Sequence, residues 1–364
     1  MQQVEVKVVP PYAALIEAGL IARLGAPLGA ALAGRGSLFV VTAPPIREHW
    51  AAPLSAALDA AGLRHEVLEI RDGERYKTLA TVGDLAARLV RRGADRRSAL
   101  LALGGGVVGD VTGFTAAIYM RGIPVVQIPT TLLAQVDASV GGKTGVDLRA
   151  GKNLVGVFHQ PRAVFIDPVT LTTLPEREYR SGLFEALKCG IIANPAIFRF
   201  MEEQREKILA RDAVALEWLI AACVRVKAEV VAVDEHESGL RRILNFGHTI
   251  GHALEAETGF KHFLHGEAVA WGMIAAATIA VSTGRADAAT ARRIASAVLA
   301  YAPLPPVEAR SARIVRRLSV DKKTLNGVVH FVLPVAIGQV EIISDVPSAT
   351  VAQAVDELRR LRRS

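Results

Sequence analysis

Five short apolar runs follow one another over the first half of the chain, and this pattern constrains the fold more than any other feature. The runs are rich in Val, Ile and Leu and occupy Ser37–Ala43, His65–Ile70, Ser98–Leu103, Pro124–Thr130 and Ala163–Pro168. Helical segments at Ile46–Ala61 and Thr81–Arg92 lie between the early runs. Strands that are apolar throughout are typical of a parallel sheet covered on both faces. We therefore predict an α/β domain with a parallel sheet.

The pattern changes near Thr172–Glu178, where long helical segments begin to dominate. They are predicted over Arg177–Ile192, Pro195–Leu209, Ala213–Val233, Thr249–Glu257, Glu267–Val281 and Ala286–Ala300. Near the end, Val328–Ile343 is predicted to form a small strand pair. A chain of 364 residues is too long for one ordinary core. We predict two domains, residues 1–175 and 176–364, the second mostly α-helical.

The net charge limits the kinds of molecule that the chain is expected to bind. The formal charge of +7 suits nucleic acid or an anionic small molecule. Aromatic residues make up only 5% of the chain and do not alternate with Lys and Arg, which argues against stacking on nucleic acid. The most apolar run, Ala268–Val281, is too short to span a bilayer. We expect a small anionic ligand, without nucleic acid or membrane.

The location is predicted from the cysteines and the N-terminus. Cys189 and Cys223 are far apart in apolar surroundings and form no CxxC pair. Such usage suits a reducing compartment. The first ten residues alternate like a strand and lack the apolar core of a signal peptide. We expect a soluble cytoplasmic protein.

A glycine turn follows the third apolar run, in the stretch "LALGGGVVGD". Gly104, Gly106 and Gly109 fit G-x-G-x-x-G, a pattern that lets backbone N–H groups approach a pyrophosphate. A tight strand-to-helix turn explains the glycines equally well, and Asp110 follows them directly. The stretch "VGGKTGV" resembles the end of a P-loop, but Asp137 stands where that motif needs glycine, so we exclude a P-loop NTPase.

Charged residues lie among glycines in "DASVGGKTGVDLRAGKN". Asp137, Lys143, Lys152 and Asn153 follow a predicted strand, and ligands of open α/β sheets bind at the carboxyl ends of strands. Lysines there can hold phosphate or carboxylate as point charges. An exposed loop with solvated lysines is the alternative explanation.

Histidines and carboxylates gather in the predicted helical half. His248 and His252 in "NFGHTIGH" share one helix face, with Asn245 one turn earlier. His262, His265 and Glu267 follow, and Glu185 and Lys188 lie at i, i+3 in an apolar helix. Two histidines and a carboxylate suit catalytic zinc with an open position. Spacing alone does not choose the ligands, and Glu185 with Lys188 is also explained as a helix ion pair.

Together these stretches resemble the 3-dehydroquinate synthase family within the sugar-phosphate cyclase superfamily. The resemblance is carried, in family order, by "DGERYK", "GGGVVGDVTGF", "YMRGIPVVQIPTTLLAQVDASVGGKTGVD", "GKNLVG", "GLFEALKCG", "KAEVVAVDEHESGLRRILNFGHTIGHALE", "HGEAVAWGM" and "DKKTLNG". It implies an N-terminal Rossmann-like nucleotide-binding domain and a mostly α-helical C-terminal metal-binding domain.

The resemblance also implies NAD and a divalent metal, Zn²⁺ or Co²⁺, as cofactors. The implied metal ligands are Glu185, His248 and His265. The implied NAD-binding residues are Asp72, Gly73, Glu74, Arg75, Tyr76, Lys77, Gly105, Gly106, Val107, Val108, Gly109, Asp110, Thr130, Thr131, Asp137, Lys143, Thr170, Leu171, Thr172 and Thr173. The implied substrate-binding and catalytic residues are Lys152, Asn153, Lys188, Lys227, Arg241, Asn245, His252 and Lys323.

The family's activity is conversion of 3-deoxy-D-arabino-heptulosonate 7-phosphate to 3-dehydroquinate and phosphate, a carbon–oxygen lyase step of the shikimate pathway and aromatic amino acid biosynthesis. The resemblance thus predicts a cytoplasmic homodimeric enzyme acting on an anionic sugar phosphate. Its rivals are cyclases that make a deoxyinosose or a valiolone, and an iron- or zinc-dependent alcohol dehydrogenase, which would release NADH. Where the family usually carries Asp or Asn beside the adenosine ribose, this chain has Ala43 and Pro44. We further predict that Asn245, His248 and His252 share one face of a single helix.

Overall fold

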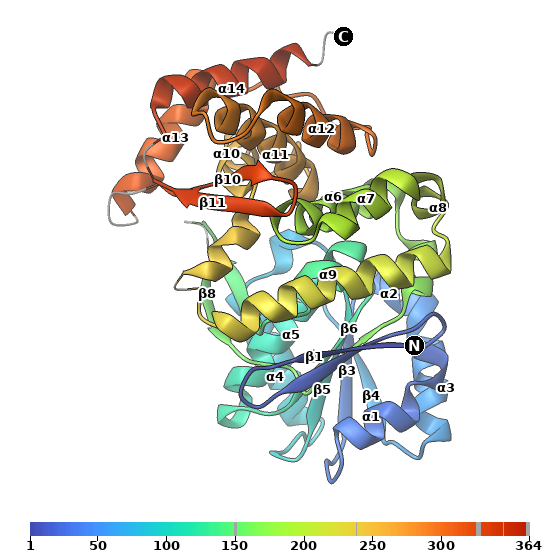
Figure 1. Ribbon diagram of the computed structural model, residues 1–364. Coiled ribbons are helices and arrows are strands. Elements are labelled where there is room, and N and C mark those ends of the chain that lie inside the picture. Colours follow the sequence, from blue (N-terminus) through green and yellow to red (C-terminus); the bar gives the residue numbers. More distant parts are fainter. Residues whose placement is uncertain (149–150, 238, 325–328, 345, 362–364) are drawn as a thin grey trace. The chain divides into compact units, whose positions relative to one another are not determined.

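The computed structural model describes the whole chain except residues 149–150, 238, 325–328, 345 and 362–364, and it leaves the side chains of 320–324 undescribed. The chain forms two compact units (Figure 1). The first contains Met1–Pro175 and Leu209–His236, and the second contains Glu176–Ile208 and Glu237–Ser364.

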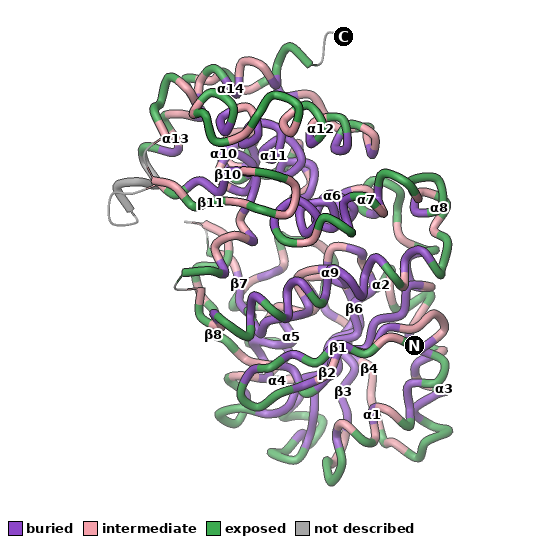
Figure 2. Tube along the Cα trace, in the orientation of Figure 1, coloured by how far each residue is buried: buried purple, intermediate pink, exposed green. Residues whose placement is uncertain are grey.

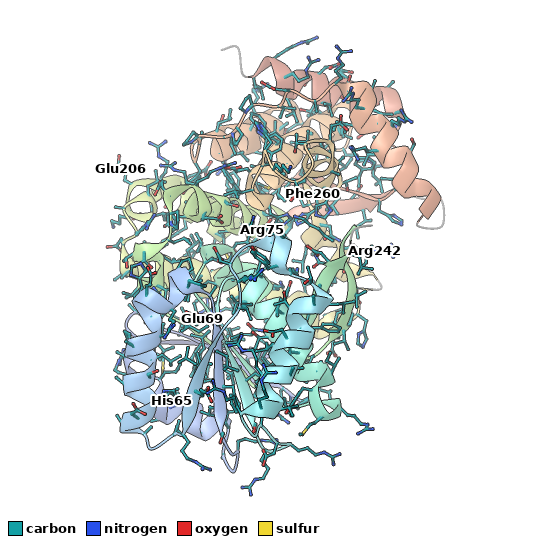
Figure 3. All side chains as sticks on the ribbon, turned by 180° about the vertical axis from the view of Figure 1, so that it is seen from behind. His65, Glu69, Arg75, Glu206, Arg242 and Phe260 are labelled. Atoms are coloured by element: carbon teal, nitrogen blue, oxygen red, sulfur yellow. The ribbon has the colours of Figure 1, made fainter. Side chains whose placement is uncertain are left out.

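The first unit is built on a seven-stranded sheet with the order β1-β2-β9-β6-β5-β3-β4. Its strands are β1 Gln2–Val6, β2 Tyr12–Ile16, β3 Leu38–Thr42, β4 His65–Glu69, β5 Ala99–Gly104, β6 Val125–Pro129 and β9 Ala163–Ile166. Figure 3 labels His65 and Glu69, the two ends of β4. All neighbours from β2 to β4 are parallel. Each of the five predicted apolar runs contains one of these strands, except that β5 extends one residue beyond its run, to Gly104.

The central strand β5 shows why the sheet is apolar on both faces. Every residue of β5 is buried, as is every residue of β3 and β6, two strands that Figure 2 labels and colours as buried. Leu100 and Ala102 belong to one hydrophobic cluster, and Leu101 and Leu103 belong to another. Successive side chains of a strand point to opposite faces, so both faces need helical cover. The prediction of a parallel sheet buried on both faces is therefore confirmed.

Helices supply that cover. The helical elements of this unit are η1 Ile21–Arg23, α1 Gly25–Ala31, α2 Pro44–Ile46, η2 Arg47–Ala51, α3 Ala52–Ala60, η3 Glu74–Tyr76, α4 Leu79–Arg91, α5 Gly106–Ile118, η4 Tyr119–Arg121, η5 Ala134–Ala138, η6 Pro168–Thr173 and α9 Ala213–Val233. Leu85 of α4 and Val111 of α5 join the first cluster, and Leu28 of α1 and Leu58 of α3 join the second. Cover on both faces is typical of α/β folds.

Two arrangements in this unit were not predicted. β1 and β2 form an antiparallel hairpin at the edge of the sheet, and β7 Lys143–Leu148 pairs with β8 Gly151–Phe158 in a separate two-stranded sheet. The helix α9 contacts β1 and β2 and groups with the first unit, although its residues lie within the predicted C-terminal domain, 176–364. The predicted division of the chain thus differs from the compact units by the segment Leu209–His236.

The second unit is mostly helical, as the sequence predicts. Its elements are α6 Glu176–Ile192, α7 Pro195–Glu203, α8 Arg205–Leu209, η7 Leu240–Asn245, α10 His248–Glu257, α11 His265–Ser282, α12 Ala288–Leu299, α13 Ser311–Thr324, β10 Phe331–Ala336, β11 Gln339–Ile343 and α14 Ser348–Arg360. β10 and β11 form the predicted strand pair, whose expected first residue, Val328, lies outside the described part. The very apolar α11 packs against α6, α10, α12 and α14. No helix in the described part of the chain has the length and apolar character needed to cross a membrane.

Candidate functional site

The glycine turn joins β5 to α5 and leaves the start of that helix accessible. Gly105 is the N-cap of α5, and no side-chain hydrogen bond caps the helix within the described residues. A Cβ atom on Gly105 would lie 2.8 Å from Cγ2 of Thr131, and one on Gly109 would lie 2.9 Å from Oε1 of Gln127. The turn lines a small hollow together with Asp110. The free N–H groups at the start of α5 can therefore approach an anion.

A network of polar side chains includes Asp110 of α5. Nζ of Lys77 lies 2.5 Å from Oδ2 of Asp110 and donates a hydrogen bond to Oδ1 of Asn153 at 2.5 Å. Nζ of Lys152 lies 3.7 Å from Oε1 of Glu74. Burial lowers the pKa of Lys77, but the charges of Asp110 and Glu74 outweigh it and the net pKa is raised. Lys77 thus remains positively charged at neutral pH.

This network joins two groups of residues that the resemblance assigns to different ligands. Glu74, Lys77 and Asp110 belong to the predicted NAD group, and Lys152 and Asn153 belong to the predicted substrate group. The structure brings the five together through β8, where Asn153 has a left-handed φ of 55° and its N–H donates to Asp147 Oδ1.

A second pair combines the predicted groups in the same way. Lys227 of α9 is 7% exposed, and its Nζ donates to the backbone oxygen of Asp137 at 2.6 Å and to Oδ1 at 2.5 Å. Lys143, at the start of β7, is exposed. The resemblance assigns Lys227 to substrate and Asp137 and Lys143 to the nicotinamide side.

The predicted threonines hold loops at the ends of β6 and β9. The N–H of Thr130 donates to the carbonyl of Gly104 at 3.0 Å, and Oγ1 of Thr131 accepts from the N–H of Ala134 at 3.2 Å. Oγ1 of Thr170 accepts from Nε2 of Gln135 at 2.9 Å. These bonds fix both loops at the carboxyl edge of the sheet, the edge at which ligands of open α/β sheets bind.

The remaining predicted NAD residues lie in or beside η3, at the start of α5 and in η6. Leu171 and Val108 are buried, Val107 is half-buried and Thr172 is exposed. Gly73 has a φ of 101°, which favours glycine, and the guanidinium of Arg75 stacks 4.7 Å from the ring of Tyr76 (Figure 3 labels Arg75). Ala43 caps the short α2 without a side-chain bond, and Pro44 begins it.

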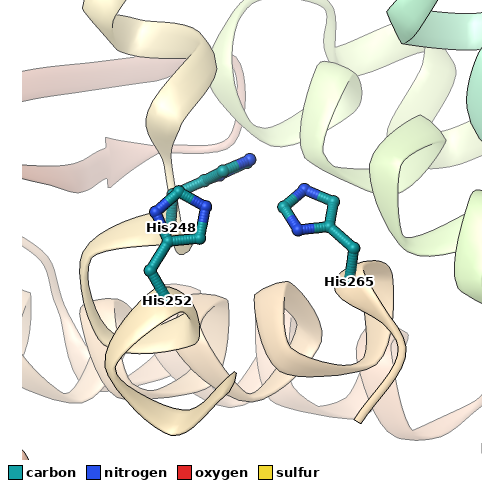
Figure 4. A group of neighbouring side chains, drawn as sticks. All are labelled: His248, His252 and His265. Atoms are coloured by element: carbon teal, nitrogen blue, oxygen red, sulfur yellow. The ribbon is translucent and has the colours of Figure 1, made fainter. Parts of the chain in front are cut away.

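Two helices of the second unit bring three histidines together (Figure 4), and a third helix adds a carboxylate. His248 and His252 lie on α10 and His265 begins α11, and ligand atoms of the three lie within 4.8 Å of one another. Oε1 of Glu185, on α6, lies 3.9 Å from Nε2 of His248 and 3.6 Å from Nε2 of His265. The structure thus brings together the three residues predicted as metal ligands, with His252 beside them.

Close packing through glycine explains this convergence. Gly247 has a φ of 79°, and a Cβ atom there would lie 2.7 Å from the carbonyl oxygen of Val269 on α11. A Cβ atom on Gly266 would lie 1.9 Å from the carbonyl oxygen of Ser181 on α6. Side chains at these positions would separate α11 from its neighbours. Because α11 lies this close to both, His265 reaches Glu185 and His248.

Glu185 is a buried carboxylate whose surroundings are incomplete. It is 1% exposed and forms an ion pair with Nζ of Lys188, yet neither of its oxygens has a hydrogen-bond partner within the described residues. Burial and the charge of Lys188 lower the pKa of His248 well below its ordinary value. Burial also lowers the pKa of His265, but a hydrogen bond to Glu255 and the charge of Glu185 raise it overall. A carboxylate oxygen without a hydrogen-bond partner, Oε1 of Glu185, beside two imidazoles fits a divalent cation.

The prediction of one helix over "NFGHTIGH" is wrong. Asn245 ends the 3₁₀ helix η7, and α10 begins only at His248 after the left-handed Gly247. Nδ2 of Asn245 donates to Oε1 of Glu237 at 2.7 Å. Arg241, also on η7, is 1% exposed. The glycine breaks the helical periodicity from which a common face was predicted.

Two other candidates in the histidine stretch serve different contacts. Nε2 of His262 lies 3.1 Å from the carbonyl of Pro306. The carboxylate of Glu267 forms a two-bond pair with Arg177 and accepts from the N–H of Leu264. These bonds hold the start of α11. The side chain of Lys323 lies outside the described residues.

Two carboxylates near the site were missed from the sequence. Glu237 contacts Asn245, and Oε2 of Glu255 lies 3.4 Å from Nδ1 of His265. Glu255 lies seven residues after His248 on α10 and is 3% exposed. Glu255 could have been found because it is a carboxylate at a helical position expected to be buried, and carboxylates are rarely buried without a partner.

Comparisons with known proteins cover most of the chain. Residues 67–181 match the family model for the 3-dehydroquinate synthase N-terminal domain, and residues 182–324 match the C-terminal one. A 3-dehydroquinate synthase from Koribacter versatilis is 59% identical over 323 residues, which cover 89% of this chain and 88% of the relative.

Solved structures show the same fold. 2-Epi-5-epi-valiolone synthase from Streptomyces hygroscopicus, with NAD⁺ and Zn²⁺ bound, superposes with a TM-score of 0.87 at 28% identity and 97% coverage of both chains. 2-Deoxy-scyllo-inosose synthase, complexed with carbaglucose-6-phosphate, NAD⁺ and Co²⁺, also gives 0.87 at 25% identity, covering 98% of this chain and 99% of that one.

Proposed function

Because the chain belongs to the 3-dehydroquinate synthase family, we propose that it is a phosphate-eliminating lyase that converts 3-deoxy-D-arabino-heptulosonate 7-phosphate to 3-dehydroquinate and phosphate. The observation that carries this assignment is the cluster of the buried Glu185, Lys188 and His248 with the partly exposed His265, in a chain of that family. It combines a candidate metal position with buried cations. We place the enzyme in the cytoplasm as a homodimer, as the family resemblance implies.

We propose Glu185, His248 and His265 as the metal ligands. The orphaned oxygens of Glu185 and its distances to both Nε2 atoms support this choice. A set of His248, His252 and His265 is the geometric alternative. It would leave Oε1 of Glu185 without a hydrogen bond in the described structure, and buried polar atoms are rarely left so. His252, which lies beside this set, would then donate a hydrogen bond to substrate or transfer a proton.

NAD is the second proposed cofactor. We infer that its pyrophosphate binds the start of α5 at Gly105–Asp110, since the glycines leave the helix N–H groups accessible. NAD when bound supplies a hydride acceptor, and Zn²⁺ or Co²⁺ a Lewis acid for neighbouring oxygens. The structural relatives bound to NAD⁺ with Zn²⁺ or Co²⁺ support both cofactors.

The chain's cations suit a substrate that carries both a carboxylate and a phosphate. Arg241 offers a planar fork for an oxyanion, and Lys152, Lys188 and Lys227 offer point charges. Lys188 and Lys227 are held by Glu185 and Asp137, so their ammonium groups have fixed positions. Asn245 is held by Glu237 in the same way. Groups that are held before substrate arrives lose less entropy on binding.

A phosphate-release assay with and without a chelator tests the assignment. Heptulosonate phosphate should release phosphate with no net NADH, and chelation should abolish release while NAD binding persists. Accumulating NADH would instead indicate an alcohol dehydrogenase. Equal turnover of glucose 6-phosphate, which lacks the carboxylate, would indicate another sugar-phosphate cyclase. Full turnover without any divalent metal would contradict the proposed metal role.

A further inference from the structure

His265 lies between two carboxylates that contact opposite sides of its ring. Nε2 lies 3.6 Å from Oε1 of Glu185, and Nδ1 lies 3.4 Å from Oε2 of Glu255. Glu255 belongs to α10, is 3% exposed, and lies on the side of the ring away from Glu185. We propose that Glu255 is a positioning residue that holds His265 with Nε2 directed at the metal. This inference rests on the metal site proposed above.

The chemistry of imidazole supports this role. A neutral imidazole has one N–H donor and one nitrogen with a free lone pair, and only the latter binds a metal. An ionised carboxylate is an acceptor only, so Nδ1 of His265 carries the hydrogen that points at Glu255. The lone pair is then on Nε2, the nitrogen that faces Glu185. The contact fixes both the tautomer and the rotation of the ring.

His248 is oriented by the same principle with a different acceptor. Its Nδ1 lies 3.1 Å from the backbone carbonyl of Phe246, and its Nε2 faces Glu185 at 3.9 Å. A backbone carbonyl cannot be removed by substitution, whereas a side-chain carboxylate can. Glu255 is therefore the partner through which ligand orientation can be tested.

The start of α11 does not fix the ring by itself. Gly266 N donates to Oγ of Ser181, and Glu267 is bound to Arg177, so the two residues that follow His265 are anchored to α6. These contacts set the Cα position and leave rotation about the side-chain bonds free. Within the described contacts of His265, Glu255 is the group that hydrogen-bonds Nδ1.

The test measures metal affinity in the full-length protein. Zn²⁺ affinity is determined by competition with a chromophoric chelator, and the Co²⁺ absorption spectrum reports the ligand geometry. Glu255→Leu should weaken Zn²⁺ binding by about 10- to 100-fold, the effect typical of outer partners of ligating histidine. Glu255→Gln keeps an acceptor oxygen for Nδ1–H and should recover most of the affinity, which a merely structural role would not predict.

Glu257→Gln is the matched control. Glu257 lies two residues further along α10 and pairs with Arg313 and Arg317, away from the histidines. Its loss should leave Zn²⁺ affinity and the Co²⁺ spectrum unchanged. If Glu255→Leu fails to fold in chelator, as judged by circular dichroism, Glu255→Asp replaces it. Its shorter side chain should also weaken binding, by about tenfold.

The outcomes separate this inference from the metal site on which it depends. Wild-type affinity in Glu255→Leu, or in Glu255→Asp where that variant is used, would overturn the role of Glu255. If Glu185→Gln retains stoichiometric metal, the proposed ligand set itself fails. If Glu185→Gln loses the metal and the Glu255 variants keep it, only the positioning role fails.

Discussion

Lys77 in one unit and Glu185 in the other are both buried charges, but their surroundings differ. Lys77 contacts the carboxylate of Asp110 and the amide of Asn153, both at 2.5 Å. Glu185 has one ion-pair partner, Lys188, and its second oxygen faces two imidazoles at 3.6 and 3.9 Å, beyond hydrogen-bonding distance. The first cluster is complete as folded, whereas the second leaves carboxylate oxygens for a cation.

The charges around Lys77 stabilise the fold by themselves, whereas the charge of Glu185 is placed to bind a ligand. A buried ion pair with good geometry offsets its own desolvation, so removing one partner is costly. A buried carboxylate without hydrogen bonds is costly as it stands. Substitutions around Lys77 should therefore lower stability and leave metal content unchanged, whereas substitution of Glu185 should lower metal content.

Glu185→Gln should have the largest effect. Without this ligand, bound metal should fall from about one per chain to roughly a tenth or less. Phosphate release should fall by about a thousandfold, because the metal supplies several kcal/mol of charge stabilisation. Metal content by mass spectrometry of the dialysed protein and the phosphate assay measure both. Glu257→Gln on α10 is the control, and stoichiometric metal in Glu185→Gln would show that Glu185 serves only as the partner of Lys188.

Lys77→Met should lower stability without changing metal content. It leaves Asp110 without its cation, at a cost of about 1–3 kcal/mol in the free energy of unfolding. Asp110→Asn in the same background should recover part of that loss, and a double-mutant cycle from urea unfolding gives the coupling. Additive losses would show that the two residues do not stabilise each other. A loss of metal in Lys77→Met would contradict the separation of the two clusters.

Gly105→Ala tests the glycine turn beside Asp110 with a smaller expected effect. The added Cβ would lie 2.8 Å from Cγ2 of Thr131, so the start of α5 must shift. NAD affinity, measured by calorimetry, should fall by about tenfold, which corresponds to about 1.4 kcal/mol and lies within the range of about 1–3 kcal/mol typical of overpacking. Gly83→Ala is the control, since nothing lies within 4 Å of its added Cβ in the middle of α4. It should stabilise the protein by about 0.5–1 kcal/mol and leave NAD affinity unchanged.

The sheet and the helices were accessible from the sequence because their determinants are local. The apolar run at Ser98–Leu103 predicts β5, and the helical pattern of Ala213–Val233 predicts α9, each from residues within the element itself. The antiparallel β1–β2 pair and the packing of α9 on those strands depend on contacts between distant segments. No local pattern encodes such contacts, which is why the predicted domain boundary missed the placement of α9.

The residues of the site can also be divided into those that local sequence patterns indicate and those that depend on contacts between distant segments. Histidine spacing indicated a metal site, and the family resemblance supplied Glu185 as a ligand. The spacing also suggested one helix through Asn245 and His248, but Gly247 at a φ of 79° ends it. Glu255 was missed because its role depends on the close approach of α11, which is set by glycines that carry no functional group themselves.

The pH dependence of metal binding should give the smallest effect. It tests whether His265 is protonated before His248 as the pH falls. In the metal-free protein the pKa of His265 is raised and that of His248 is lowered well below its ordinary value. A proton on His265 therefore competes with the metal first as the pH falls. Zn²⁺ affinity should drop below the pKa of His265 by about tenfold or less per pH unit, as one displaced proton requires. A chelator-competition titration measures the slope, and a slope of two protons over the same range would show that His248 is protonated together with His265.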